Sequence, residues 1–357
     1  MNLNGFLNGG IMRIADTAAR FYLGNRRGQA FLFGAVGAFR KSARIREQYE
    51  KSGTHIPPFL IASVASRCNL RCAGCYARAT GGCRDDRNDL SADDWRRVFA
   101  QAEEVGVSFI LLAGGEPLLN RGIIEAAADF PRVVFPVFTN GTLIDESYID
   151  LFDEHRNLIP VLSLEGDDVR TDARRGAGVA EKVRTAAENL KSRGVLYGAS
   201  ITVTRENMRE VTEPDFARAL REGGCGVAFY VEYVPAEPDT EHLVLAKEDL
   251  SVLAARVDAL RAEVGGMIVL SFPGDEEAMG GCLAAGRGFF HINAAGGAEP
   301  CPFSPFSQMN LREHALLDVL RSEFFAAVRE IGAEEAQNHA GGCALFNRRS
   351  EVAAFLG

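Results

Sequence analysis

The chain has 357 residues, of which 47% are hydrophobic, so it is long enough for a full core and a smaller appended module. Its net charge of −9 argues against nucleic acid as the main partner. No apolar run approaches the roughly 20 residues needed to span a bilayer, and the N-terminus lacks the pattern of a signal peptide. We therefore expect a cytoplasmic protein whose eight cysteines are metal ligands rather than disulfides.

The N-terminal segment, residues 1–55, is basic although the whole chain is acidic. Residues 1–51 contain nine Lys or Arg and three Asp or Glu. Together with the apolar stretch FLFGAVGAF at 31–39, this composition predicts one or two amphipathic helices interrupted by glycines. We expect a helical extension packed on the main domain. The alternative is a peripheral contact with the inner face of an anionic membrane, or with an anionic partner.

From residue 56 onward, short apolar runs alternate with amphipathic helices. Ser91 is expected to cap one helix, with Asp94 three residues on, and Gly194 to end another. The expected strands are 59–66, 107–115, 133–140, 159–166, 195–204 and 227–234, and the expected helices are 90–106, 121–129, 146–155, 178–193, 206–221 and 248–264.

Six strand–helix alternations with nearly continuous apolar strands are typical of parallel strands covered on both faces. Six units fall short of the eight that close a full barrel, so we expect an α/β fold with a partial (β/α)6 TIM-like barrel over residues 56–265. Beyond it the alternation stops. Residues 266–357 contain three more cysteines and are expected to form a small, separate C-terminal module.

The sequence SRCNLRCAGCYARA places Cys68, Cys72 and Cys75 in C-x3-C-x2-C spacing directly after the first expected strand. Four close cysteines would suggest a closed tetrahedral zinc site, whereas three thiolates suit a cubane iron–sulfur cluster with one iron left open. The adjacent arginines, Arg67 and Arg71, are expected to lower the pKa of these thiols. The loop leaves the carboxyl end of its strand, where parallel α/β folds place their chemistry.

This spacing resembles the cysteine signature of the radical SAM superfamily, and the resemblance covers about residues 56–345. It does not depend on the cysteines alone, because further motifs follow in the order typical of the family. These are GGEP at 114–117, TNGT at 139–142, SLEG at 163–166 and TDARRGAG at 171–178, the last similar to the HDxxRG stretch of members that modify peptides and proteins.

The resemblance implies that the three cysteines hold a [4Fe–4S] cluster whose fourth iron binds S-adenosylmethionine. Reductive cleavage of this cofactor would give a 5′-deoxyadenosyl radical that takes hydrogen from an unidentified substrate, with a flavodoxin or ferredoxin as a typical reductant. The residues implied to bind the cofactor are Tyr76, Gly114, Gly115, Glu116, Ser163 and Arg175. One position departs from the family: an aromatic residue usually precedes the third cysteine, and here that residue is Gly74.

A second set of cysteines lies in the C-terminal part. Cys282 and Cys301 flank FFHIN, an expected strand, and AAGGAEP, an expected hairpin turn. This resembles the first half of a SPASM domain, and because only Cys343 follows, the module resembles the shortened twitch form. That form implies one auxiliary [4Fe–4S] cluster, held by these three cysteines. The fourth ligand is left open between Cys225, Cys83, a histidine and the substrate.

Cys83 is the one catalytic candidate: it could donate hydrogen to a product radical, cover the active site or have no role. Cys225 is expected to be a small core residue that enters a strand. Six further polar residues lie near strand ends or in the expected hairpin, where we expect caps, ion pairs or satisfied polar groups rather than catalysis. They are Glu165, Asp167, Glu232, Tyr233, Asp275 and His291.

The sequence therefore predicts a radical SAM oxidoreductase or maturase that acts on a peptide, a protein or a metabolite. One alternative is a membrane-associated enzyme of the same kind that acts on a lipid. The other is a non-catalytic iron–sulfur protein for electron transfer or regulation. The GGEP and TDARRG motifs favour an enzyme, because an electron carrier has no use for a strand end that binds an amino acid.

Overall fold

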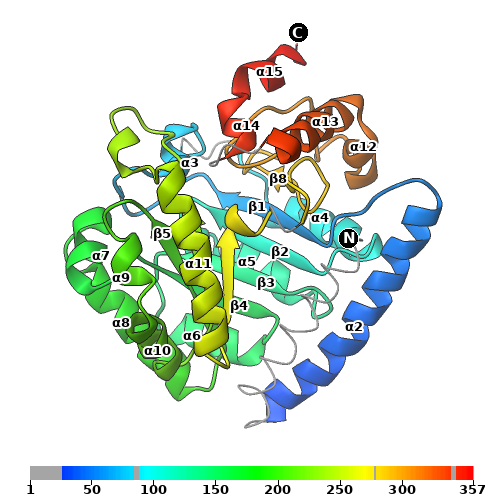
Figure 1. Ribbon diagram of the computed structural model, residues 1–357. Helices are drawn as coiled ribbons and strands as arrows, with labels where there is room; N and C mark the ends of the chain where they lie inside the picture. Colours follow the sequence, from blue (N-terminus) through cyan, green and yellow to red (C-terminus); the bar gives the residue numbers. More distant parts are fainter. Residues whose placement is uncertain (1–25, 84–87, 277–278, 339–342, 357) are drawn as a thin grey trace.

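The computed structural model describes residues 26–83, 88–276, 279–338 and 343–356, and Figure 1 shows its arrangement. Ten strands form one sheet in the order β10-β9-β8-β1-β2-β3-β4-β5-β6-β7. The strands are β1 (Phe59–Ala65), β2 (Phe109–Gly114), β3 (Phe135–Thr139), β4 (Leu158–Leu164), β5 (Tyr197–Val203), β6 (Cys225–Glu232), β7 (Ile268–Phe272), β8 (His291–Ile292), β9 (Gly297–Glu299) and β10 (Met309–Asn310).

Strands β1 to β7 are parallel, and each pairs with the next along the chain. The first six are the strands expected from the sequence. The described sheet ends at β7 on one side and at β10 on the other, so it does not close on itself. The prediction of a partial TIM-like barrel is confirmed. Strand β7 was not expected, and it carries the sheet across the boundary that the sequence places between residues 265 and 266.

The helices follow the strands in the expected alternation. Ser91 caps α4 and forms a reciprocal capping box with Asp94, as predicted. The expected helix over 206–221 is divided, because Pro214 has no N–H to continue a helix and begins a new one. The bounds are α3 (Tyr76–Ala79), α4 (Ala92–Glu104), α5 (Arg121–Ala128), α6 (Glu146–Glu154), α7 (Asp168–Arg175), α8 (Val179–Ser192), α9 (Met208–Val211), α10 (Pro214–Glu222) and α11 (Lys247–Glu263).

Helix α2 (Arg26–Lys51) runs through Gly34 and Gly37 without a break, so the expected interruption is not found in the described part of the N-terminal segment. Its Leu32, Ala35 and Phe39 pack against residues at the start of β2 to β5. The apolar face of α2 therefore covers the amino ends of the strands (Figure 1, blue helix). Within the described ranges, no helix is long and apolar enough to cross a bilayer.

The C-terminal part is joined to the barrel through main-chain pairing. Strand β8 lies parallel to β1, and β8 and β9 form the predicted hairpin. Helices α12 (Leu316–Arg321), α13 (Glu323–Asn338), α14 (Ala344–Asn347) and α15 (Arg349–Ala354) follow. They gather at the upper end of Figure 1 together with α3, whereas α2 extends to the opposite end. The loop with Cys68, Cys72 and Cys75 follows the carboxyl end of β1 and therefore lies at this upper end.

Candidate active site

The loop cysteines, as we name Cys68, Cys72 and Cys75, follow the carboxyl end of β1. The Sγ atom of Cys68 accepts a hydrogen bond of 3.4 Å from the main-chain N–H of Leu70. The Leu70 carbonyl in turn accepts one of 3.0 Å from the guanidinium of Arg78, which lies on α3. The loop is thus folded back on itself, so three thiols from eight residues are held at one strand end.

The GGEP motif lies beside the start of this loop. The main-chain N–H of Gly115 donates to the Ala65 carbonyl at 2.6 Å, and that of Glu116 donates to the Arg67 carbonyl at 2.8 Å. A Cβ atom on Gly115 would lie only 2.0 Å from the Arg67 carbonyl oxygen, and Gly114 has a φ of +120°. Both positions therefore need glycine, because only glycine permits this approach of two backbones.

Glu116, predicted to bind the cofactor, has a side chain that is almost fully buried. Its Oε1 accepts hydrogen bonds from the Thr139 hydroxyl at 2.7 Å and the Leu118 N–H at 3.1 Å, and its Oε2 accepts one from the Asn140 N–H at 2.8 Å. Burial raises the pKa of this carboxyl group. The carboxylate ties GGEP to the TNGT motif at the end of β3, and its contact with a cofactor stays a prediction.

Asn140 continues this connection toward the cysteines. Its side-chain amide donates to the Asn69 side chain at 2.8 Å, and its oxygen accepts from the Thr142 N–H at 3.0 Å. The Asn69 amide donates back to the Thr142 hydroxyl at 2.8 Å. Ser163, another predicted cofactor contact, is half-buried near the end of β4 and pairs in register with Ser200 of β5. The motif residues of strands β2, β3 and β4 therefore lie at the same end of the sheet.

Two partly buried arginines of α7 bind one buried carboxylate. Glu165, directly after β4, accepts hydrogen bonds of 2.5 Å from Arg174 and of 2.5 and 2.9 Å from Arg175, all at Oε1. Its Oε2 is buried and has no hydrogen-bond partner in the described structure. Arg174 also donates to the Ala73 carbonyl at 3.1 Å. Helix α7 is thus fastened to the cysteine loop.

The strongest positive charges on the Cys72 thiol come from these two arginines of α7. Burial raises the pKa of Cys72, and the positive charges of Arg175 and Arg174 oppose this rise more than any other group. The expectation that Arg67 and Arg71 lower the thiol pKa is therefore wrong for Cys72. The cause is spatial, since α7 packs on the loop while those two side chains are exposed.

Cys83, the catalytic candidate, lies next to the last loop cysteine. A hydrogen bond between the two thiols lowers the pKa of Cys75 and raises that of Cys83. The main-chain N–H of Cys83 donates to the Ala77 carbonyl at 2.8 Å, which fixes this proximity. Cys83 thus lies close to the loop cysteines, and its role as a hydrogen donor stays a prediction.

Tyr233, just past the end of β6, fills the space beside Gly74. Gly74 has a φ of +65°, and a Cβ atom there would lie 2.3 Å from the Tyr233 hydroxyl oxygen and 2.8 Å from its ring. Tyr233 is 5% exposed, and its hydroxyl has no hydrogen-bond partner among the described residues. Glu237 accepts a hydrogen bond of 2.7 Å from the Gly74 N–H. In the sequence, the glycine at position 74 in place of the usual aromatic residue indicated that this position is unusual. The sequence did not indicate that Tyr233 fills the space beside it.

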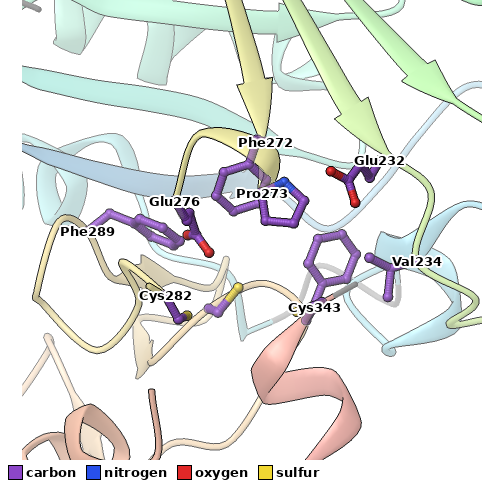
Figure 2. Close-up of a pocket in the computed structure, with 10 residues that line it drawn as sticks. Glu232, Val234, Phe272, Pro273, Glu276, Cys282, Phe289 and Cys343 are labelled. Atoms are coloured by element: carbon purple, nitrogen blue, oxygen red, sulfur yellow. The ribbon is translucent and has the colours of Figure 1, made fainter. Parts of the chain in front are cut away.

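The module cysteines, as we name Cys282, Cys301 and Cys343, line one pocket between the barrel and the C-terminal part (Figure 2). The thiols of Cys301 and Cys343 lie within hydrogen-bonding reach; this contact and burial raise the pKa of Cys301. The other lining residues are five apolar or aromatic side chains and two carboxylates. They are Val234, Phe272, Pro273, Phe289, Phe303, Glu232 and Glu276.

The two cysteine groups approach each other around Tyr76, a predicted cofactor contact. This side chain is partly buried, and burial raises the pKa of its hydroxyl group. The pKa of the Tyr76 hydroxyl is also raised by the charges of Cys75, Cys83 and Cys301. Thiols of both cysteine groups therefore lie near the Tyr76 ring. The structure therefore brings together two parts of the chain that the sequence separates by more than half its length.

Other polar candidates have partners that explain them. His291 does not face solvent: its ring nitrogens lie 2.7 Å from the Ser63 hydroxyl and 2.7 Å from the Glu299 carboxylate. Asp167 caps α7, as expected for a residue at that position. Asp275 pairs with Arg261 at 2.6 and 2.7 Å.

Cys225 begins β6, so it lies at the amino end of the strand and away from the cysteine groups. It is fully buried and donates to the Val227 carbonyl at 3.2 Å, as expected for a core residue.

Both cysteine groups fit a larger inorganic centre better than a single metal ion. In the described parts of the chain, no three His, Cys, Asp or Glu side chains gather closely enough to hold one ion. The thiolates of a zinc site would each lie about 2.3 Å from the metal and so would lie close together. The module cysteines, which line one pocket, would suit an iron–sulfur cluster, because its irons each take their own ligand.

Comparisons with known proteins agree with this chemistry. The profile of the radical SAM superfamily matches residues 63–222. The PqqA peptide cyclase of Granulibacter bethesdensis is 25% identical over 282 residues, which cover 74% of this chain and 74% of that protein. The AdoMet-dependent heme synthase of Methanosarcina barkeri is 26% identical over 320 residues, which cover 81% and 89%.

Solved structures give the same fold. Streptococcus suis SuiB, bound to S-adenosylmethionine or to the precursor peptide SuiA, aligns with a TM-score of 0.66 in both cases. The identities are 20% and 22%, with 82% and 81% of this chain and 72% and 70% of SuiB covered. Residues 63–222 of this enzyme form a radical SAM domain, which implies a [4Fe–4S] cluster and S-adenosylmethionine as cofactors, and the chain is similar to enzymes of that superfamily.

Proposed function

We propose that this enzyme abstracts hydrogen from a peptide substrate and that it holds two [4Fe–4S] clusters, one on the loop cysteines and an auxiliary one on the module cysteines. The observation that carries the proposal is the approach of both cysteine groups to Tyr76 at the carboxyl end of the barrel. When bound, the first cluster and S-adenosylmethionine supply an electron and a 5′-deoxyadenosyl radical. The auxiliary cluster offers a nearby acceptor for the electron that remains after hydrogen abstraction.

The chain's own residues have separate tasks in this proposal. The glycines of GGEP let the β2 end lie against the cysteine loop, which forms a cradle for the methionine part of the cofactor. Arg175 contributes positive charge beside Cys72, where a carboxylate of the cofactor would be neutralised. The proposed cofactor-binding residues are Tyr76, Gly114, Gly115, Glu116, Ser163 and Arg175.

The peptide class of substrate is supported by the relatives. One is named a PqqA peptide cyclase, and SuiB has been solved with a precursor peptide. To test the class, a pool of deuterated peptides and a pool of deuterated small metabolites are incubated separately with the reduced enzyme and S-adenosylmethionine. We expect deuterium in the recovered 5′-deoxyadenosine from the peptide pool. Deuterium from the metabolite pool alone would contradict a peptide substrate.

The central reaction is tested without knowledge of the substrate. Anaerobic protein reduced with dithionite should release 5′-deoxyadenosine from S-adenosylmethionine. The variant with alanine at all three loop cysteines should release none, whereas Cys225→Ala, which removes a buried thiol remote from both groups, should match the wild type. No release from wild-type protein that carries its full iron content would overturn the proposal.

A further inference from the structure

We propose that the carboxylate of Glu276 is the fourth protein ligand of the auxiliary cluster. This inference rests on the proposed function, which places a cluster on the module cysteines. Glu276 ends a short 3-10 helix, Gly274–Glu276, that directly follows β7. It lines the same pocket as the three module cysteines, so one carboxylate and three thiols face one space.

Three of the protein ligands considered from the sequence, Cys225, Cys83 and His291, are disfavoured by their positions in the described structure, and His339 lies outside the described residues. Cys225 is buried at the start of β6 and donates to a main-chain carbonyl of its own strand. Cys83 lies against Cys75 and does not line the pocket. Both ring nitrogens of His291 are engaged, by Ser63 and Glu299. None of these residues can reach the module cysteines without breaking the contacts that hold it.

The Glu276 side chain is held in place beside a module cysteine. Its Oε1 accepts a hydrogen bond of 3.1 Å from the N–H of Leu283, the residue that follows Cys282. The carbonyl of Glu276 accepts another of 2.8 Å from the Gly281 N–H. Figure 2 shows the carboxyl group directed toward Cys282. The second carboxylate oxygen therefore remains for a metal, in a side chain that needs no large movement to bind it.

The surroundings of Glu276 also favour a positively charged ligand for its carboxylate. Its carboxyl group lies in a pocket whose other walls are mostly apolar, and it forms no ion pair within 4.0 Å among the residues the structure describes. Glu276 is partly buried, and a carboxylate that loses part of its contact with water is costly unless it is paired or binds a metal. The guanidinium of Arg287 acts on it only at a distance, since that group bonds to the carbonyls of Met279, Gly281 and Cys282. An iron atom would supply the missing charge.

A second carboxylate in the pocket provides the matched control. Glu232, the last residue of β6, is 8% exposed and lines the same pocket. Figure 2 places it beside Val234, on the far side of Phe272 and Pro273 from Cys282. Among the charged groups, Glu276 has the largest electrostatic effect on Cys282. We therefore expect only Glu276 to bind iron, although both side chains are carboxylates in the same pocket.

The ligand set has a chemical consequence. A carboxylate donates less electron density to iron than a thiolate and is a harder ligand, so it leaves one iron different from the other three. Replacing this carboxylate with a thiolate should lower the reduction potential of the cluster. Removing it should leave one iron without a protein ligand, and that iron should be lost on mild oxidation.

The experiment uses the full chain with alanine at the loop cysteines, so that the auxiliary cluster is the only iron centre. Iron content, the electron paramagnetic resonance spectrum and the reduction potential are measured before and after mild oxidation. In this background, mild oxidation should lower the iron content of Glu276→Ala and of Glu276→Gln from about four to about three atoms per chain. Glu276→Cys should keep all four and show a lower potential. Glu232→Ala and Glu232→Gln should behave as the background does.

Each other outcome overturns the inference. If the three Glu276 variants keep the spectrum and potential of the background, Glu276 is not a ligand; if the Glu232 variants change them instead, the wrong carboxylate has been chosen. Glu276→Gln keeps the size of the side chain, and Glu276→Cys tests for a gained ligand, so misfolding of Glu276→Ala does not decide the result. If the background binds no iron, the auxiliary cluster fails as well, while 5′-deoxyadenosine release by the wild type reports separately on the first cluster.

Discussion

The rings of Tyr76 and Phe303 lie 5.2 Å apart between centroids and are tilted by 56°. Tyr76 directly follows the last loop cysteine, and Phe303 comes two residues after Cys301, so this ring contact joins the two cysteine groups. Two packed aromatic rings have few alternative arrangements. Their contact therefore fixes the distance between the loop cysteines and the module cysteines. The geometry between the proposed clusters therefore depends on this pair.

The first prediction concerns the contact between the Tyr76 and Phe303 rings. Phe303→Ala should lower the free energy of unfolding by about 3 kcal/mol, because it removes a buried ring and leaves a cavity. Chemical denaturation of the wild type and the variant measures the difference. Phe33→Ala is the control: that ring is 75% exposed, so its loss should change the free energy by less than about 0.5 kcal/mol. Equal losses in both variants would contradict the packing described.

The second prediction concerns Gly74. Gly74→Ala should impair iron binding by the loop cysteines, because the new methyl group would overlap the Tyr233 side chain. It should also cost roughly 1–2 kcal/mol of stability, since the residue has a positive φ. Iron content after reconstitution in the module-cysteine alanine background, together with thermal unfolding, measures both effects.

Two matched variants separate the overlap from the backbone strain. Gly53 has a φ of +82° with nothing near its missing Cβ, so Gly53→Ala should cost stability without loss of iron. In the double variant Gly74→Ala/Tyr233→Ala the overlap is gone, and iron binding should recover although the strain remains. A double variant that binds iron no better than Gly74→Ala would show that Tyr233 does not fill this space.

The third prediction concerns the carboxylate shared by two arginines. Glu165→Gln should lower the free energy of unfolding by about 3 kcal/mol, because it removes a buried carboxylate and leaves the partly buried guanidinium groups of Arg174 and Arg175 without a counter-charge. Asp215→Asn removes one partner of an exposed ion pair with Arg218 and should cost less than about 0.5 kcal/mol. Denaturant unfolding of both variants checks the contrast, and similar small losses would mean that Glu165 does not hold α7.

The sequence was informative wherever the pattern is local. Six strands were found because each is a continuous apolar run, and the Ser91 cap because its partner lies three residues away. Strand β7 was missed because its five residues stand in a glycine-rich stretch and are followed by Pro273, which does not resemble the earlier units. The split of the expected helix at Pro214 also has a local cause, because proline cannot continue a helix but can begin one, and the prediction of one helix over 206–221 did not take this into account.

The site was less accessible from the sequence, because its contacts join distant segments. The three loop cysteines come from one loop, and their spacing alone predicts that they act together. Nothing in the spacing indicates that Arg174 and Arg175 act on Cys72, or that Tyr233 lies on Gly74. These neighbours depend on how α7 and the end of β6 pack over the loop, which only the three-dimensional arrangement determines.

The last prediction concerns pH and uses Cys225, which lies apart from both cysteine groups. Burial raises the pKa of its thiol from 9.0 to about 12 in the folded protein. Well below pH 9 the thiol is mostly protonated in both the folded and the unfolded chain, so it causes little pH dependence there. Between pH 9 and 12 the unfolded chain loses the proton and the folded chain keeps it, so stability should fall by about 1.4 kcal/mol per pH unit from this group.

Cys225→Ala and Cys225→Ser lack the titrating thiol, so their stability relative to the wild type should improve steadily as the pH rises from 8.5 to 11. The comparison cancels the titration of tyrosines and lysines, which all three proteins share. Urea unfolding at a series of pH values measures the differences, and a constant offset would contradict the raised pKa. For the same reason iodoacetamide, which attacks the thiolate, should not label Cys225 in the folded protein at pH 8 but should label it in urea.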